Sequence, residues 1–251
     1  MIGPIYLPEE GRKNLPVVIG LTGFLHFTER GRCEAALERL ASSPYNLSGI
    51  KINFPGINIK CNGDIECEFN LQDYIAELRE TIEFIRQDKI FNSEKIGVFA
   101  SSLGAGIFGH YLAQNPDSHG ISSAVLVSPF TGWSHFATPY LREAKLTSDR
   151  ALISSTQDYQ TEIIRYIPKQ CFPEVRKTDV LPVLRDSDLQ IEVMTIIGKY
   201  DQVVEPKSMK KMHSALHGKR GNLLKYRASH EVPHEAYIER AASFLANSLI
   251  N

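Results

Sequence analysis

Short apolar runs alternate along this chain with segments in which apolar residues recur every three or four positions. The first pattern predicts buried strands, and the second predicts amphipathic helices. Strands are expected at residues 5–8, 15–22, 49–54, 96–100, 124–128, 191–198 and 223–226. Helices are expected at residues 29–40, 71–85, 105–114 and 236–249. This alternation predicts an α/β protein with a mostly parallel central sheet and helices on both of its faces.

One long segment, residues 130–188, breaks this alternation. It carries helical fragments, no convincing strand, and several aromatic residues that include Trp133, Phe136 and Tyr140. Structureless stretches of this length inside a compact domain are usually functional. We therefore expect a single domain over residues 1–251 with a helical lid inserted at about 130–188, whose aromatic side chains line an apolar substrate cleft. The alternative is a helical decoration in which these aromatics form its own core.

The junction between the strand at 96–100 and the following helix carries the most informative motif. A serine between a strand and a helix, with small residues two before and two after, is typical of a nucleophile elbow, because the turn is too tight for larger side chains. Ala100 and Gly104 meet this condition for Ser102. The same condition fails for Ser101, whose corresponding neighbours are bulky. Ser102 is therefore the predicted nucleophile, although small residues and serines also occur in ordinary strand-to-helix turns.

An acid and a base follow two later strands. Asp201 comes just after the strand at 191–198, and His230 comes just after the strand at 223–226. Sites of open parallel sheets lie at the carboxyl ends of strands, and the order Ser, Asp, His is the one expected with this type of elbow. Asp201 could instead be a simple turn residue, and His234 competes with His230 as the base. His213 and His217 are interpreted as surface residues of a separate helix.

Hydrolysis through a serine also needs two backbone N–H groups for the developing negative charge. One is expected from Leu103, the residue after the nucleophile. The other is expected from Phe24, because Gly23 would let the chain turn sharply after the strand at 15–22. Gly23 could also do no more than end that strand.

Composition and charge limit the partners, the location and the cofactors that are expected. The 251 residues have a net charge of −1 and no dense basic run, which argues against a nucleic-acid partner. No apolar stretch is long enough to span a membrane, and no signal peptide is recognisable, so a cytoplasmic location is expected. Cys61 and Cys67 do not have a common zinc spacing and are read as free thiols, although export would allow a disulfide. No metal or cofactor is expected.

Four motifs together resemble the α/β-hydrolase fold superfamily over nearly the whole chain: Thr22-Gly-Phe, Ala100-Ser-Ser-Leu-Gly-Ala-Gly, Gly198-Lys-Tyr-Asp and Ser229-His-Glu. The likeness is greatest to small esterases, acyl hydrolases and dienelactone-hydrolase-like proteins. It implies a serine hydrolase that cleaves an ester or thioester of a small-molecule acyl substrate through an acyl-enzyme. A peptidase or C–C bond hydrolase with the same triad is the runner-up, and a non-catalytic binding protein on this fold is the rival from another class.

Overall fold

The computed structural model describes residues 2–8, 13–23, 31–52, 57–59, 65–67, 70–116, 120–132, 150–158, 161–168, 177–184, 189, 191–218 and 222–250. Seven strands form the main sheet: β1 (Ile2–Tyr6), β2 (Leu15–Leu21), β3 (Ser48–Ile52), β6 (Phe91–Ser101), β7 (Ile121–Val127), β10 (Glu192–Gly198) and β11 (Leu223–Tyr226). Their order across the sheet is β1-β3-β2-β6-β7-β10-β11. β1 pairs antiparallel with β3, and the other neighbours are parallel, so the predicted mostly parallel sheet is confirmed.

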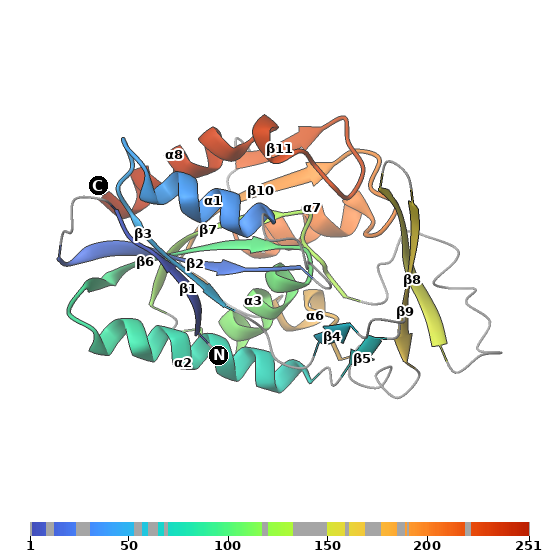
Figure 1. Ribbon diagram of the computed structural model, residues 1–251, viewed down its shortest axis with the longest axis horizontal. Coiled ribbons are helices and arrows are strands. Elements are labelled where there is room, and N and C mark those ends of the chain that lie inside the picture. Colours follow the sequence, from blue (N-terminus) through green and yellow to red (C-terminus); the bar gives the residue numbers. More distant parts are fainter. Residues whose placement is uncertain are drawn as a thin grey trace.

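Helices cover both faces of this sheet (Figure 1). α1 (Arg32–Ala41) and α8 (Ile238–Ile250) pack on one face, where their apolar side chains form one core with β6, β7 and β10. α2 (Leu71–Gln87), α3 (Leu103–Gln114), α6 (Leu181–Leu184) and α7 (Pro206–Ala215) pack on the other face and form the second core. The short 3₁₀ helix η4 (His234–Ala236) leads into α8.

α2 shows how the sequence pattern produces these layers. Its predicted apolar stripe is buried against the sheet, and Ile75, Leu78 and Ile82 are each at most 1% exposed. Asn70 ends the preceding segment and its side-chain oxygen accepts a hydrogen bond from the Gln72 N–H, which satisfies one of the unpaired donors of the first helical turn. The helix therefore begins where its cap lies and faces the core along one side.

The strand order reverses next to β2. The chain leaves β2 through α1 to β3 on one side, and returns through α2 to β6 on the other side. The connection after β2 enters α1 and the one after β6 enters α3, on the opposite face, so the two diverge and leave a crevice at the carboxyl ends of β2 and β6. This crevice is where the elbow after β6 emerges.

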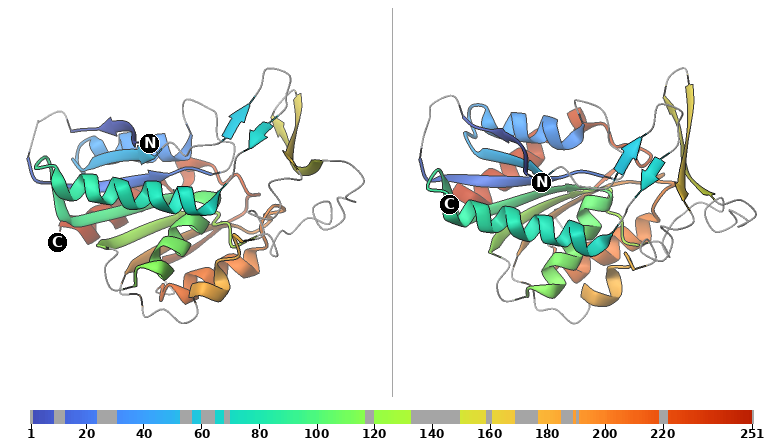
Figure 2. Two further views of the ribbon diagram at one scale, coloured as in Figure 1. Left: turned by 90° about the horizontal axis from the view of Figure 1, so that it is seen from below. Right: turned by 60° about the horizontal axis from the view of Figure 1, so that its bottom comes forward.

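Two small antiparallel pairs lie outside the main sheet, beyond the end at which its parallel strands finish (Figures 1 and 2). β4 (Ile57–Ile59) pairs with β5 (Ile65–Cys67), and β8 (Arg150–Asp158) pairs with β9 (Thr161–Pro168). The expectation of helical fragments without a strand is therefore wrong for residues 150–168. The many β-branched residues of β9 favour a strand, and β8 is its antiparallel partner in a local hairpin. A lid over the carboxyl edge stays a prediction.

Within the described ranges, no helix is both long and apolar enough to cross a membrane. The same part of the chain contains no group of three or more His, Cys, Asp or Glu side chains placed to hold a metal ion.

Candidate active site

The backbone at Ser102 has the strained conformation of a sharp strand-to-helix turn. β6 ends at Ser101, α3 begins at Leu103, and Ser102 between them has a φ of 49° and a ψ of −116°. Non-glycine residues rarely adopt positive φ, and such strain concentrates at functional sites. Gly104 must be small because a β-carbon there would lie 2.6 Å from the carbonyl oxygen of Leu21. The turn thus has the geometry that the sequence predicts for an elbow.

Hydrogen bonds to the segment after β7 hold the backbone of Ser102 on both sides. Its N–H donates to the carbonyl of Val127 at 2.9 Å, and its own carbonyl accepts from the N–H of Phe130 at 2.9 Å. Ser102 itself is partly exposed. The turn is therefore rigidly placed while the hydroxyl remains reachable.

His230 bridges Ser102 and Asp201. Its Nε2 lies 3.0 Å from Ser102 Oγ, and its Nδ1 lies 2.7 Å from Asp201 Oδ2. With a proton on Nδ1 donated to the carboxylate, Nε2 is free to accept the hydroxyl proton of Ser102. Three side chains from the ends of β6, β10 and β11 thus form one connected chain of hydrogen bonds, 128 residues apart at its widest.

The Asp201 side chain is fully buried, so its orientation depends on hydrogen bonds. Oδ1 accepts from the N–H groups of Val203 and Val204 at 2.8 and 2.9 Å, which leaves Oδ2 aimed at His230. A buried carboxylate needs such partners because desolvation is otherwise costly. Asp201 therefore has both of the roles considered from the sequence: Oδ1 holds the turn, and Oδ2 pairs with His230.

His234, the competing candidate for the base, and His213 contact other residues. The His234 side chain is 43% exposed at the start of η4 and is 3.3 Å from Glu235. The interpretation of His213 as a surface residue is wrong. It is 3% exposed, and its Nδ1 lies 2.9 Å from the hydroxyl of Thr195 on β10, a partner that helix periodicity cannot reveal.

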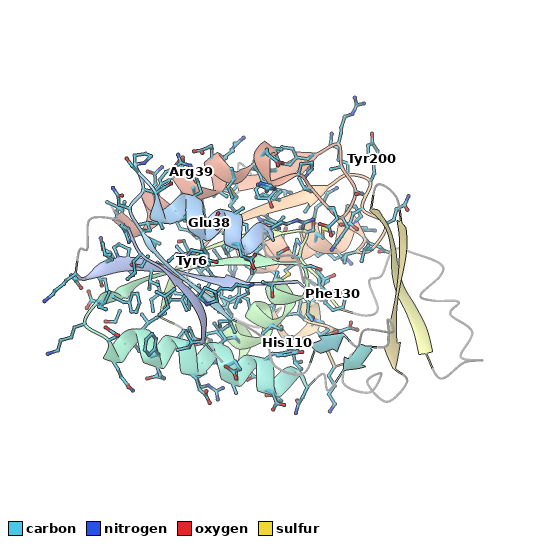
Figure 3. All side chains as sticks on the ribbon, viewed as in Figure 1. Tyr6, Glu38, Arg39, His110, Phe130 and Tyr200 are labelled. Atoms are coloured by element: carbon cyan, nitrogen blue, oxygen red, sulfur yellow. The ribbon has the colours of Figure 1, made fainter. Side chains whose placement is uncertain are left out.

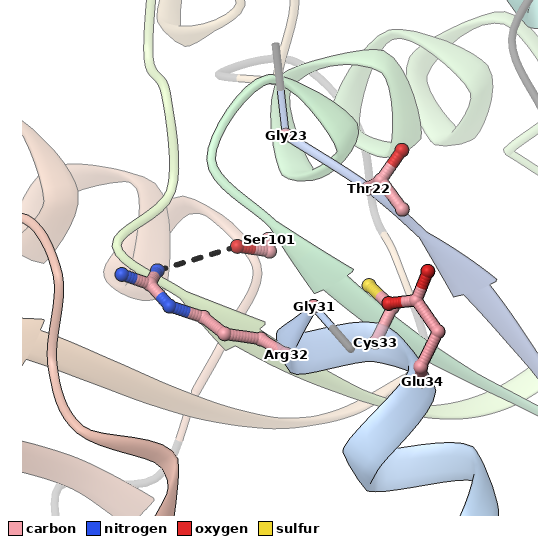
Figure 4. Close-up of a pocket in the computed structure, with 7 residues that line it drawn as sticks. All are labelled: Thr22, Gly23, Gly31, Arg32, Cys33, Glu34 and Ser101. Atoms are coloured by element: carbon pink, nitrogen blue, oxygen red, sulfur yellow. Dashed lines mark hydrogen bonds between the residues drawn. The ribbon is translucent and has the colours of Figure 1, made fainter. Parts of the chain in front are cut away.

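The predicted oxyanion donors are only partly within the described residues. Leu103 is the first residue of α3, so its N–H belongs to the first helical turn and has no partner within the helix. Phe24 lies outside the described residues, as do Trp133, Phe136 and Tyr140. Thr22 and Gly23, which precede Phe24, lie beside Ser101 in a small pocket at the carboxyl end of β2 (Figure 4).

The Serine hydrolase (FSH1) family matches residues 66–242, which is most of the chain. The chain belongs to this serine hydrolase family. No curated protein matches its sequence significantly.

Solved structures with the same fold cover nearly the whole of this serine hydrolase. Est1E from Butyrivibrio proteoclasticus has a TM-score of 0.71 at 14% identity, over 98% of this chain and 93% of the other. The monoacylglycerol lipase of Paleococcus ferrophilus has a TM-score of 0.66 at 15% identity, over 99% of both chains. A Mycobacterium tuberculosis puromycin-hydrolyzing peptidase has a TM-score of 0.64 at 13% identity, over 98% of this chain and 37% of the other. At such identities the likeness shows the α/β-hydrolase fold alone.

The structure of this serine hydrolase also places a buried arginine, missed from the sequence, behind the histidine. The Arg32 side chain is 7% exposed and lies at the start of α1. It points toward Ser101 (Figure 4) and donates to the carbonyl of His230 at 3.0 Å. The hydroxyl of Ser128 donates to the same carbonyl at 2.7 Å. No local sequence signal marks Arg32, because its partners are far away along the chain.

Burial separates two other titratable groups of the serine hydrolase from the reaction. Cys33 is 2% exposed, and burial raises the pKa of its thiol strongly, so the thiolate that would act as a nucleophile is not formed near neutral pH. Burial lowers the pKa of His110 on α3, although a hydrogen bond to the backbone of Thr178 opposes this. Both groups lie in the folded core and are not part of the hydrogen-bonded row formed by Ser102, His230 and Asp201.

Proposed function

We propose that this protein cleaves a carboxylic ester or thioester through an acyl-enzyme, with Ser102 as nucleophile, His230 as general base and acid, and Asp201 as the group that orients the histidine. The observation that supports this most is the pair of distances along the row: 3.0 Å from Ser102 Oγ to His230 Nε2, and 2.7 Å from His230 Nδ1 to Asp201 Oδ2. Both lie within hydrogen-bonding reach, which general-base activation of a hydroxyl requires.

In the first half of the reaction, Ser102 Oγ attacks the carbonyl carbon while its proton moves to His230 Nε2. The tetrahedral intermediate carries a negative oxygen, and the imidazolium is stabilised by the Asp201 carboxylate. The intermediate then collapses as the bond to the leaving oxygen or sulfur breaks. His230 gives its proton to that atom, so an alcohol or thiol departs and Ser102 retains the acyl group.

In the second half, water takes the place of the alcohol. His230 Nε2 removes one proton from the water, whose oxygen attacks the acyl carbon and forms a second tetrahedral intermediate. When this intermediate collapses, the bond between the acyl carbon and Ser102 Oγ breaks. The proton returns from His230 to Ser102, and the acid is released. The same two nitrogen atoms of one imidazole thus serve both halves.

Two backbone N–H groups are proposed to bind the negative oxygen. The Leu103 N–H follows the nucleophile directly and belongs to the first turn of α3, where the helix dipole also favours negative charge. Phe24 is the proposed second donor, from its place after Gly23 in the sequence. The approach of β2 to the start of α3 supports this, because a β-carbon on Gly104 would lie 2.7 Å from the carbonyl oxygen of Thr22.

The proposed substrate is a small molecule with an apolar acyl group. This rests on the aromatic residues of the 130–188 insertion, among them Trp133, Phe136 and Tyr140, and on the absence of a strong net charge. Each buried methylene is worth about 0.8 kcal/mol, or roughly a fourfold gain in kcat/KM until the pocket is filled. Values of kcat/KM for p-nitrophenyl esters of rising chain length should therefore increase from acetyl onward. A flat or falling series contradicts the apolar cleft and leaves the triad untouched.

A fluorophosphonate probe tests the hydrolase mechanism itself. The wild-type protein should be labelled on Ser102 and should hydrolyse p-nitrophenyl esters, and Ser102→Ala should do neither. A non-catalytic binding protein would not be labelled in either form. Parallel assays with a p-nitroanilide of the same acyl group separate an esterase from a peptidase, because faster turnover of the amide would favour the peptidase.

A further inference from the structure

We propose that Arg32 is a positioning residue for the general base, and that it fixes the distance between His230 and Ser102 by binding the Ser101 hydroxyl on one side and the His230 carbonyl on the other. This proposal rests on the proposed function. Its starting point is a guanidinium group that is almost fully buried yet contacts three residues on two segments that are distant from it in sequence.

The first contact concerns the nucleophile. Arg32 Nη1 lies 3.4 Å from the hydroxyl of Ser101, the residue immediately before Ser102 (Figure 4). Ser101 is 1% exposed, so its side chain turns inward beneath the elbow while Ser102 remains partly exposed. The guanidinium therefore lies under the strand end that presents the nucleophile.

The second contact concerns the base. Arg32 Nη2 donates to the carbonyl of His230 at 3.0 Å, and the Ser128 hydroxyl donates to the same oxygen at 2.7 Å. The Val232 N–H of the same loop also donates to this oxygen at 3.1 Å, so Arg32 and Ser128 are the donors that tie the carbonyl to other elements. Because this carbonyl belongs to the residue that bears the imidazole, fixing it fixes the backbone from which the ring extends. The ring itself is then held by Asp201.

The third contact balances charge. Arg32 Nη2 also forms an ion pair with Glu231, whose side chain is half exposed. An unpaired cation buried behind the imidazole would be costly and would oppose the imidazolium that forms during the reaction. Glu231 offsets that charge. Arginine suits this position because its planar fork can donate in several fixed directions at once, which lysine cannot do.

The geometric consequence is large because catalysis depends steeply on placement. A misplacement of about 1 Å in a catalytic group can cost about 10²-fold in rate. Loss of Arg32 leaves the Ser128 hydroxyl and the Val232 N–H of the same loop as the described donors to the His230 carbonyl, and it removes the link to Ser101. We therefore expect the loss to lower the rate of proton transfer from Ser102 without altering substrate binding.

Arg39 supplies a matched control on the same helix. Like Arg32 it pairs with a carboxylate, here Glu239 on α8, and donates to a hydroxyl and a carbonyl, those of Ser42 and Ser43. It lies seven residues after Arg32, about 10 Å along the helix axis, and Figure 3 shows it among the α1 and α8 side chains. Arg39→Met thus removes a similar set of contacts away from the reacting atoms.

The test compares Arg32→Met, Arg32→Lys and Arg39→Met with the wild type by kcat, KM, Tm and the rate of fluorophosphonate labelling. Arg32→Met should lose at least about 10-fold in kcat and in labelling rate with KM unchanged. Arg32→Lys keeps the charge and the aliphatic stem but not the fork, and it should recover only part of the loss. Arg39→Met should keep the wild-type kcat.

Each outcome decides between the proposals. Wild-type kcat in a folded Arg32→Met or Arg32→Lys protein overturns the role of Arg32 while labelling of the wild type upholds the proposed function. An equal loss in Arg32→Met and Arg39→Met at matched loss of Tm also overturns it, because the effect would then follow stability. If the wild type itself is neither labelled nor active on esters, both proposals fall.

Discussion

Gly198 lies against the backbone of Ser229 so closely that a β-carbon on residue 198 would be 1.9 Å from the Ser229 carbonyl oxygen. Gly198 ends β10 just before the turn that carries Asp201, and Ser229 immediately precedes His230. The two loops that supply the acid and the base are therefore in direct backbone contact at this point. Only a residue without a side chain permits that approach.

Gly198→Ala should consequently damage activity more than stability. The added methyl group must push the Ser229 segment away, at a cost of about 1–3 kcal/mol for overpacking, and a shift of His230 by about 1 Å should cost about 10²-fold in kcat. Gly97→Ala is the control, because the nearest atoms to its β-carbon would be the side-chain ends of Leu245, Leu249 and Ser123, with no backbone atom among them. A Gly198→Ala protein with wild-type kcat would contradict this coupling between the loops.

Ser102→Ala should abolish ester hydrolysis, with a loss of at least about 10⁴-fold in kcat, while Tm stays close to the wild-type value. Serine and alanine both carry a β-carbon, so the substitution leaves the backbone strain at residue 102 nearly unchanged. Ser101→Ala removes a 3.4 Å contact with Arg32 and should keep most of the activity. Greater loss at residue 101 than at residue 102 would reverse the assignment of the nucleophile.

His230→Gln should lose at least about 10⁴-fold in kcat, because no other described imidazole lies within reach of Ser102 Oγ. His234→Gln should keep most of the activity, since its side chain is 43% exposed and lies beside Glu235. The measurement is kcat on an activated p-nitrophenyl ester. Equal losses of kcat at the two positions would contradict the assignment of His230 as the base.

Asp201→Asn should lower kcat by about 10⁴-fold with little change of fold. The asparagine oxygen can still accept from Val203 and Val204, which turns its NH₂ group toward His230 Nδ1. Nδ1 must then accept a hydrogen bond, so the ring proton moves to Nε2. Protonated Nε2 can no longer receive the proton of Ser102. Asp88→Asn is the control, because Asp88 also accepts from a nearby N–H, that of Ile90, away from the site. Unchanged kcat in Asp201→Asn would refute the orienting role.

His110 should make stability depend on pH in the acidic range. Burial lowers its pKa in the folded protein below the ordinary value of 6.5, so between these two pKa values the unfolded chain binds more protons. Stability therefore rises with pH in this window and falls as pH is lowered through it, by at most about 1.4 kcal/mol per pH unit for one group. His110→Gln should flatten the profile of Tm between about pH 7 and pH 5. Identical profiles for the two proteins would exclude this linkage.

Sequence patterns predicted most of the main sheet, because its strands and helices bury continuous apolar stretches that leave a strong periodic signal. The positions of Ser102, Asp201 and His230 were also predictable, since each follows the carboxyl end of a strand and those ends meet at one edge of the sheet. The structure brings the three together as expected. Their catalytic roles stay a prediction until the variants are measured.

Other features depend on contacts that sequence periodicity does not encode. Arg32 reads as one charged residue of an amphipathic helix, and its partner His230 is 198 residues away. The sequence predicts His213 to be a polar residue of a surface helix, but its side chain is buried and its Nδ1 is hydrogen-bonded to the hydroxyl of Thr195 on the adjacent strand. The β8–β9 hairpin was missed because neither strand alternates regularly between apolar and polar residues. In each case a distant or unexpected partner decides the outcome.

The two backbone hydrogen bonds of Ser102 imply that the nucleophile and the base leave their native positions at different stages of unfolding. Ser102 is bonded to Val127 and Phe130 and therefore moves only when the centre of the sheet comes apart. His230 belongs to an irregular segment outside the helices and strands, and such segments open locally at a lower free energy than the core. Mild denaturant should thus detach the base first and leave a natively folded, inactive protein. Recovery from that state would need only reclosure of one loop, without refolding of the chain.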